Sequence, residues 1–346
     1  MRKPRYLNID AIREVKKFKN NNFTTQEVFF MSRLFTDEEL QEMIVPTSTR
    51  IRNLFQSGDK EEAKKLWNKL VDDYMYAFDL RVDWDRAFTD YIYNNLGGDA
   101  LYEVWRYRGW TEDDIAPMKI TEERREKGLK LLDGDDYEAL DQFMDREYFL
   151  FRHSHDKRIE WETRIMGYVY EHAGPKALWE TMSSVTPHYW QHMIDVTVNG
   201  TFKDAVLEQI GGLETHGEPL EIMEDDEKVV VWMRPCGSGQ FLVEQGVYEA
   251  PSNCVRCKAC PETWNIDNFP VYCVHAPQQE ILSIKQIGWP VMVNNPLPEE
   301  RNAPGYEFAR QSCGFAVYKD PNDIPAFVYE TLGFKKPDHV EKPAKW

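Results

Sequence analysis

Every cysteine of the chain lies between residues 236 and 313, and the first 235 residues contain none. The six positions are Cys236, Cys254, Cys257, Cys260, Cys273 and Cys313. One histidine, His275, lies two residues after Cys273. Thiolates and imidazoles serve proteins as zinc ligands, and they also act as nucleophiles and bases in catalysis. This segregation indicates one local purpose, which is a metal site, a redox site or a reactive thiol.

The spacing within this group favours zinc. Cys254, Cys257 and Cys260 form a Cys-x2-Cys-x2-Cys pattern, which places three thiols on one tight loop. Cys273-x-His275 supplies further ligands, and we expect Cys273 on a strand. Tetrahedral zinc takes four ligands from Cys and His, often with a Cys-x2-Cys knuckle on one side. The candidate ligands number seven, so the sequence does not say which four bind: Cys236, Cys254, Cys257, Cys260, Cys273, His275 and Cys313.

A 4Fe–4S cluster is the alternative cofactor, because Cys-x2-Cys-x2-Cys followed by Pro261 matches part of the bacterial ferredoxin pattern. The fourth ligand would then be Cys236, Cys273 or Cys313. The cysteines could instead be reduced thiols packed as small hydrophobic side chains. A set of disulfides is less expected, because a soluble cytoplasmic chain keeps its thiols reduced.

Cys236 is also a candidate nucleophile. It follows a strand-like run and opens the Gly-Ser-Gly loop of MRPCGSGQF. Such a loop exposes backbone N–H groups and allows a ligand to approach closely. A nucleophilic cysteine needs a lowered pKa and a nearby base, and His275 is the candidate base. The alternative is a buried cysteine in a tight turn.

Two other histidine pairs are candidates for chemistry. His188 and His192 are four residues apart, so they share one helical face and could bind metal or serve as acid and base. His153 and His155 lie just before a repeated tryptophan. For both pairs the alternative is a histidine that is solvated or satisfied in the core.

The elements that must position these residues include an internal repeat with an offset of 77. Residues 82–105 align with residues 159–182 without a gap, so that Trp84 matches Trp161 and Gly97 matches Gly174. At Gly97 and at Gly174 we expect one helix to end and the next to begin. Charged and apolar residues alternate at helical spacing in both copies. We therefore predict a duplicated helical unit, with copies at about 43–105 and 120–182, folded as a pseudo-symmetric bundle. At the places of His153 and His155 the first copy has Tyr76 and Phe78, which indicates either function gained in one copy or drift.

The pattern changes after residue 212. Two strand-like runs flank the acidic turn at Asp225, which predicts a hairpin. A short helix ending at Gly288, two further strands and a helix ending at Gly333 are expected after it, followed by a loosely held tail. The predicted fold class is therefore α+β: an all-α bundle over residues 1–212 and a small α+β Cys-rich metal-binding domain over 213–346.

The composition of the chain limits the classes of molecule that it is expected to bind. The chain has 346 residues and a formal net charge of −17, so nucleic acid and anionic membranes are unexpected partners. No apolar run reaches the length of a membrane span, and the start of the chain lacks the features of a signal peptide. We expect a cytoplasmic protein that binds a small molecule, with a homodimer left open.

The segments PCGSGQF, TWNIDNFPVYCVHAPQQEILSIKQIGWP and CGFAVYKDPNDIP resemble a group of largely uncharacterised bacterial proteins similar to L-2-amino-thiazoline-4-carboxylic acid hydrolases. The resemblance is clearest over the last 130 residues or so. It implies a site built from Cys236, Cys273-x-His275 and Cys313. Ala276 replaces a further cysteine expected after the histidine, and the Cys254–Cys257–Cys260 triplet is an addition.

These observations predict a metal-dependent enzyme, with zinc as the favoured metal, acting on a small apolar or aromatic molecule. Hydrolysis, hydration and lyase chemistry all suit a zinc ion with one open position. The candidate catalytic residues are Cys236, His275, His188 and His192. One alternative is a non-catalytic ligand-binding or sensor protein with a structural zinc site. Another is an iron–sulfur redox protein.

Overall fold

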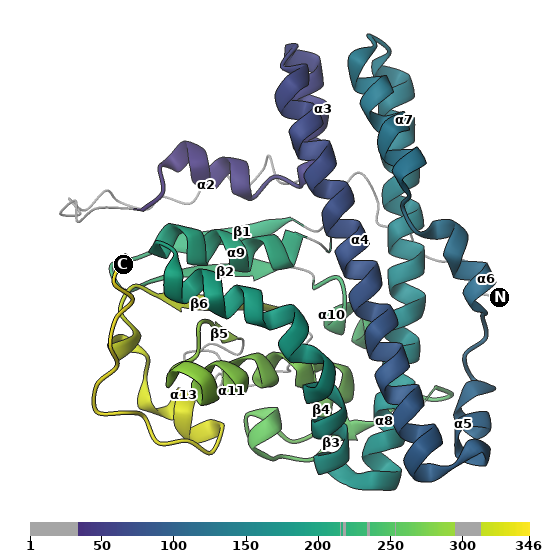
Figure 1. Cartoon of the computed structure of the whole chain (residues 1–346), viewed down its shortest axis with the longest axis vertical. Helices are drawn as coiled ribbons and strands as arrows, with labels where there is room; N and C mark the ends of the chain where they lie inside the picture. The colour runs from purple at the N-terminus through teal and green to yellow at the C-terminus, as the bar shows by residue number, and fades with distance from the viewer. Residues whose placement is uncertain (1–33, 215, 217–218, 234–235, 253, 295–312) are drawn as a thin grey trace. The chain divides into compact units, whose positions relative to one another are not determined.

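The computed structural model describes residues 34–346 apart from 215, 217–218, 234–235, 253 and 295–312 (Figure 1). At residues 37, 41–42 and 186–189 it describes the backbone alone. The described part is rich in helix and contains a small antiparallel sheet, so the predicted mixture of helix and sheet is confirmed.

Two long helices dominate the helical part. They are α4 (Lys60–Tyr91) and α8 (Tyr137–Asn199), and they pack along one another. Helix α3 (Thr47–Ser57) leads into α4, and α7 (Glu122–Asp133) leads into α8. Figure 1 shows α3 and α7 at the same end of the long pair, where each contacts both long helices.

Matching positions of the two segments have the same local structure. Asp59 caps the start of α4 by accepting a hydrogen bond from Glu62 N, and Asp136 caps α8 in the same way through Ala139 N. Such side-chain caps satisfy backbone N–H groups that have no partner inside the helix. Each of these pairs of positions lies 77 residues apart.

The glycines expected to break the helices do so. The backbone has φ of 96° at Gly97 and 86° at Gly174, a region that favours glycine. The former separates the π-helix η2 (Ile92–Leu96) from α5 (Gly98–Trp105), and the latter interrupts α8. The remaining elements of this part are α2 (Asp37–Met43), α6 (Glu112–Ile115), η3 (Ala116–Met118) and α9 (Phe202–Glu214).

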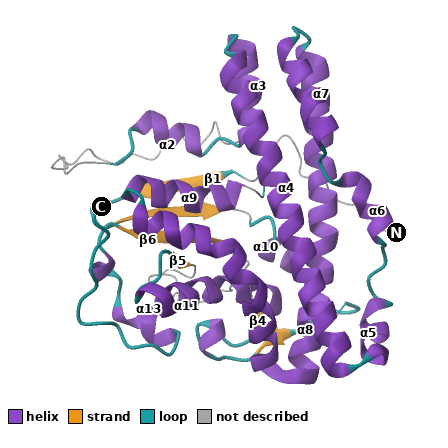
Figure 2. Ribbon diagram, viewed as in Figure 1, coloured by secondary structure: helices purple, strands orange, loops and turns teal. Residues whose placement is uncertain are grey.

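The main sheet has the order β1-β2-β6-β5, and all its neighbouring strands are antiparallel (Figure 2). The predicted hairpin is confirmed, because β1 (Leu220–Glu224) pairs with β2 (Lys228–Met233) across the acidic turn. Strand β6 (Cys313–Tyr318) pairs with β2 in a register that places Cys313 opposite Met233. Strand β5 (Val293–Asn294) completes the sheet, and α9 packs on β2.

Short elements connect the strands. They are α10 (Gly239–Glu244), β3 (Arg256–Cys257), η4 (Pro261–Thr263), β4 (Phe269–Pro270), η5 (Val271–Val274), α11 (His275–Ile287), η6 (Pro321–Asp323) and α13 (Ala326–Thr331). Strands β3 and β4 form a separate two-stranded sheet. Gly288 ends α11 in a left-handed conformation, as predicted. The expectation that Cys273 lies on a strand is wrong, because the chain turns into the 3-10 helix η5 directly after Pro270.

Helices and sheet share one hydrophobic core. Buried side chains of this core include Trp84 and Trp161 from the long helices, Val230 and Phe315 from the sheet, and Tyr272 from η5. Residues 34–346 accordingly form one compact unit. A second cluster fills the space between α3, α4, α7 and α8. The domain boundary at residue 212 stays a prediction.

The end of the chain is held more firmly than we expected. Val340 N donates a hydrogen bond to Asn322 Oδ1 at 2.8 Å. The Trp346 ring lies 5.5 Å from the Trp289 ring and 5.0 Å from the Phe202 ring. The prediction of a loosely held tail is wrong, because its last aromatic side chain finds apolar partners. Among the described helices, none combines the length and apolar character needed to cross a membrane.

Close packing between α4 and α7 yields a stability prediction. A Cβ added at Gly128 would lie 2.3 Å from the Trp67 ring, whose Nε1 donates a hydrogen bond to Arg125 O at 2.9 Å. Because the Trp67 ring is enclosed, we expect Gly128→Ala to lower the free energy of unfolding by about 1–3 kcal/mol. Urea unfolding followed by tryptophan fluorescence measures it.

The matched control is Gly211→Ala on α9, where no atom lies within 4 Å of the added Cβ. Replacing this helical glycine should raise the free energy of unfolding by roughly 0.5–1 kcal/mol. Equal effects of the two substitutions would contradict the close packing of α7 on Trp67.

Candidate functional site

Cys236 lies in a turn between β2 and α10, and its side chain is buried. The turn is fixed by Gln240, whose Oε1 accepts a hydrogen bond from Cys236 N at 3.0 Å. The chain folds over the sulfur, so that the backbone N–H groups of Ser238, Gly239 and Gln240 hydrogen-bond with it. Glycine at positions 237 and 239 permits this close approach of backbone to a side chain. The predicted exposure of backbone N–H groups therefore serves the sulfur itself.

Cys313 reaches the same sulfur from the start of β6. The β2–β6 register brings it beside the end of β2, and the two thiols hydrogen-bond with each other. This hydrogen bond, aided by the backbone N–H groups and opposed by burial, lowers the pKa of Cys236 from 9.0 to about 6. The pKa of Cys313 is raised well above its usual value, first by its hydrogen bond with Cys236 and then by burial. At neutral pH Cys236 is a thiolate and Cys313 its proton donor, and the thiolate is the reactive form of cysteine.

His155, on α8, contacts the same turn. Its Nε2 lies 3.1 Å from Ser238 Oγ, and its Nδ1 lies 3.0 Å from Asp156 Oδ1. Because a carboxylate only accepts, Nδ1 carries the proton and Nε2 accepts from the Ser238 hydroxyl. Burial, and then the charges of Arg152 and Arg81, lower the pKa of His155 well below 6.5. His155 is therefore a neutral, oriented base that contacts Ser238, two residues after Cys236.

Arg152 ties α8 to the Cys236 turn. Its Nη2 lies 2.8 Å from Asp156 Oδ1 and donates to Gly237 O at 2.9 Å. Burial raises the pKa of Asp156 to about 6, and the charge of Arg152 opposes this shift. The His216 ring stands nearly perpendicular to the His155 ring, with centroids 5.6 Å apart. These contacts hold His155 in one orientation.

A group of buried polar atoms lies beside the turn. Arg81 Nη1 donates to Glu162 Oε2 at 2.9 Å, and its guanidinium lies 5.2 Å from the Trp84 ring and 5.4 Å from the Tyr272 ring. The Tyr272 hydroxyl lies within electrostatic reach of Cys236 and close to Ser238. The Tyr272 hydroxyl hydrogen-bonds with Arg81 and Ser238. Three other buried atoms here have no hydrogen-bond partner among the described residues: Arg81 Nε, Glu162 Oε1 and Trp84 Nε1. Buried polar atoms in this situation bind water or a ligand.

A second ion pair repeats the first at an offset of 77. Arg158 Nη1 donates to Asp85 Oδ2 at 2.8 Å, and its Nη2 donates to Glu112 Oε2 at 2.7 Å. Burial raises the pKa of Asp85 well above its usual value and also raises that of Glu162. Two buried arginine–carboxylate pairs therefore cross between α4 and α8.

His275 is buried close to this group. Its Nδ1 donates to Tyr272 O at 2.8 Å, and its ring lies 5.8 Å from the Trp84 ring. Burial lowers its pKa to about 4, so it is neutral. The histidine whose hydrogen bond reaches the Cys236 turn is His155, and the role of His275 as a base stays a prediction.

The other predicted catalytic histidines lie on the second half of α8. The side chain of His188 lies outside the described residues. His192 is exposed, and its Nε2 lies 3.7 Å from Glu208 Oε2. The structure therefore provides no link between His192 and the Cys236 turn in the part of the chain that it describes.

The remaining cysteines lie on neighbouring segments. Cys257 pairs with Phe269 in the small sheet, Cys260 begins η4, and Cys273 lies in η5. Burial raises the pKa of Cys254 to about 11 and that of Cys257 to about 12. Over the described ranges, no three His, Cys, Asp or Glu side chains are arranged to hold a metal ion. The zinc and iron–sulfur sites stay predictions.

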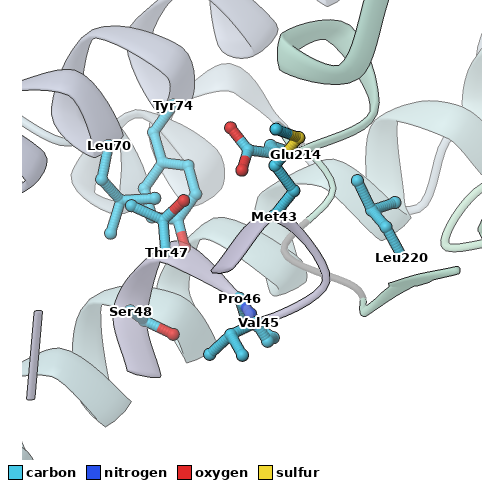
Figure 3. A pocket seen from close by; sticks show the side chains of 9 residues that line it. All are labelled: Met43, Val45, Pro46, Thr47, Ser48, Leu70, Tyr74, Glu214 and Leu220. Atoms are coloured by element: carbon cyan, nitrogen blue, oxygen red, sulfur yellow. The ribbon is translucent and has the colours of Figure 1, made fainter. Parts of the chain in front are cut away.

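Two cavities flank the region. One, of about 190 Å³, is lined by Arg164, Tyr168 and Cys254 among others. The other has room for about one water molecule, at about 10 Å³, and Figure 3 shows Tyr74 and Glu214 in its wall. The Tyr74 ring stacks on Phe151 with centroids 4.0 Å apart, and Phe151 lies against His155. Tyr74, in the wall of the smaller cavity, therefore belongs to the group of rings that packs against His155.

Sequence reasoning missed most of the residues around Cys236. Ser238, Asp156, Arg81, Glu162 and Tyr272 were not predicted to act there. One signal did exist for His155, which replaces the Phe78 of the first copy. A polar residue at a position that is aromatic in the other copy indicated a local change of role.

The hydrogen bonds around Cys236 predict how its reactivity depends on pH. The rate of alkylation by iodoacetamide should rise with pH to a midpoint near 6 and then level off, because the thiolate is the reacting form. Cys313→Ala removes the largest cause of the shift and should move the midpoint upward. Peptide mass spectrometry follows the reaction.

Cys254, in the same tryptic peptide (229–256), is the internal control and should stay unreacted at pH 7. An alkylation midpoint near 9 for Cys236 would show that these hydrogen bonds do not act on the sulfur.

Comparison with known proteins gives no family for this arrangement. No protein-family model matches the chain, and neither the curated proteins nor the solved structures contain a significant match to it.

Proposed function

We propose that the chain is an enzyme that uses the Cys236 thiolate as a nucleophile against an electrophilic carbon of a small molecule, and that the overall reaction is a hydrolysis. The observation that carries the proposal is the convergence on one turn of three features. Backbone N–H groups and Cys313 stabilise the thiolate, and a neutral histidine is oriented by a carboxylate. A base near the nucleophile that is oriented by a third group is the signature of covalent catalysis, and His155 reaches the Cys236 turn through the Ser238 hydroxyl.

The residues divide the reaction into two steps. The Cys236 sulfur bonds to the substrate carbon, the bond from that carbon to the leaving group breaks, and the leaving group takes a proton from solvent. Water then attacks the same carbon, and the bond to sulfur breaks. The Ser238 hydroxyl takes the proton of that water and passes its own proton to His155 Nε2, with which it is hydrogen-bonded. Asp156 keeps the proton of the neutral imidazole on Nδ1.

The buried polar atoms beside the turn support a substrate with a planar polar group, such as an amide or an amidine. Arg81 Nε and Trp84 Nε1 donate, whereas Glu162 Oε1 accepts. An amide or amidine offers both kinds of partner in one plane. The Trp84 and Tyr272 rings provide apolar walls, which agrees with the small aromatic molecule expected from the sequence.

Zinc bound by the Cys254–Cys257–Cys260 loop remains compatible with this proposal. The Cys236 chemistry needs no metal, since its thiolate is already stabilised. A zinc ion on the loop would then be structural, and metal analysis of the purified protein tests for it.

We also propose that α3–α5 and α7–α8 arose by duplication. The capping pair Asp59 and Asp136 supports this proposal, as do the two glycine breaks at the same offset. Further support comes from the reciprocal ion pairs between the two long helices. On this proposal His155 is a gain of function in the second copy.

The proposal is tested with p-nitrophenyl acetate, a small activated ester. We expect a burst of p-nitrophenolate equal to one per chain, and an acetyl group on Cys236 that intact-protein and peptide mass spectrometry detect. Cys236→Ala should abolish the burst. His155→Asn should retain the burst but slow the steady-state rate by about 100-fold or more, because it removes the base for water.

His153→Asn is the matched control. His153 lies two residues before His155, and its ring stacks on that of the exposed Phe149. It should leave both the burst and the steady-state rate unchanged. Acetylation of Ser238 instead of Cys236 would make the serine the nucleophile, and equal rates for the two histidine variants would remove His155 from the mechanism.

A further inference from the structure

Cys236 and Cys313 form a pair of thiols at the end of the β2–β6 ladder. Cys313 lies opposite Met233 in the ladder, Cys236 follows Met233 by three residues, and the two sulfur atoms hydrogen-bond with each other. Both cysteines are reduced in this structure. A disulfide needs a sulfur–sulfur distance of about 2.05 Å, so two thiols already in hydrogen-bond contact need only small side-chain movements.

The other thiols are less suitable partners for Cys236. Cys273 interacts with Cys236 through charge, whereas Cys313 hydrogen-bonds with it. Cys254, Cys257 and Cys260 show no interaction with Cys236 in the described part of the chain. Cys313 also keeps partial exposure to solvent, whereas Cys273 is buried. Its hydrogen bond with Cys236 and its partial exposure both favour Cys313 as the disulfide partner of Cys236.

From this juxtaposition we infer that Cys236 and Cys313 are a reversible oxidation site, at which hydroperoxides convert the two thiols into an intramolecular disulfide. Cys236 is the residue that the oxidant attacks, and Cys313 is the residue that resolves the oxidised form. The disulfide occupies the nucleophile that the proposed function requires. The inference does not depend on that function, because it concerns the thiol pair alone.

The reaction balances in two steps. The Cys236 sulfur attacks the terminal oxygen of the hydroperoxide, the O–O bond breaks, and the alkoxide or hydroxide that leaves takes a proton from solvent to become an alcohol or water. Cys236 is thereby oxidised to a sulfenic acid. The Cys313 sulfur then attacks the Cys236 sulfur, an S–S bond forms, and the S–O bond breaks. The hydroxide takes up the Cys313 proton and leaves as water. In total the two thiols give two electrons to one hydroperoxide.

The test uses the full chain, hydrogen peroxide and trypsin. Trypsin leaves Cys313 in residues 311–319, but it leaves Cys236 together with Cys254 in residues 229–256. The experiment is therefore done in the Cys254→Ser background, where a cross-link between those peptides has one meaning. One equivalent of peroxide should remove two free thiols and yield the two peptides linked, at a mass two hydrogens below their sum. Dithiothreitol should restore both thiols.

Two variants make the assignment specific. Cys313→Ser keeps a hydrogen-bond donor beside Cys236 but cannot form the disulfide, so with a second equivalent of peroxide Cys236 should proceed to the sulfinic acid without any cross-link. Cys273→Ser should leave the cross-link unchanged. A disulfide between residues 229–256 and the Cys273 peptide (259–285) would overturn the inference. So would sulfinic acid at Cys236 in the parent protein while Cys313 stays free, or a failure of peroxide to oxidise Cys236 at all. The outcome is independent of esterase activity, so the proposed function can fail without affecting it.

Discussion

Two buried ion pairs between α4 and α8 set the geometry on which the rest of the fold depends. Arg81 of α4 pairs with Glu162 of α8, and Arg158 of α8 pairs with Asp85 of α4. On each helix the arginine lies one turn before the carboxylate. Both ion pairs therefore form together only when the two helices are aligned in one register. Burial disfavours all four charges, and removing one partner would leave an unpaired charge at a cost of about 3–5 kcal/mol. Sliding one helix along the other is therefore resisted, and apolar packing alone would not provide this specificity.

The same register places His155. It lies on the helical face of α8 that carries Arg158 and Glu162, because spacings of three and seven residues return to one face. From there His155 meets Ser238, which lies 83 residues later in the chain. Arg81 extends the connection on the other side, because its guanidinium lies between the rings of Trp84 and Tyr272. The helices, the Cys236 turn and η5 thus meet in one continuous polar group inside an apolar core.

Local features of this arrangement were readable from the sequence, whereas contacts across the chain were not. The glycine breaks, the hairpin at Asp225 and the end of α11 at Gly288 depend on neighbouring residues, and they are confirmed. Cys236 on its Gly-Ser-Gly turn is confirmed for the same reason. The candidate base, by contrast, was sought in His275, which is near the cysteines in sequence. The register of two helices decides which histidine reaches the turn, and no spacing within residues 236–313 contains that information.

The two helical segments put residues that lie 77 positions apart to different uses. Arg158 has a second carboxylate, Glu112, and its guanidinium lies 4.7 Å from the Phe78 ring. Arg81 has Tyr272 at the corresponding side, close to Ser238 and Cys236. At the position of Phe78 the second copy has His155, and in place of a ring against an arginine there is an imidazole against a serine hydroxyl. A symmetric pair of ion pairs therefore has one end that is closed by aromatic packing and one end that opens onto a thiolate. Both ends carry buried polar atoms that have no hydrogen-bond partner among the described residues, at Arg158 Nε and Asp85 Oδ1 as well as at Arg81 Nε and Glu162 Oε1. The difference between the two ends therefore lies in the thiolate, because only the Arg81 end adjoins the Cys236 turn.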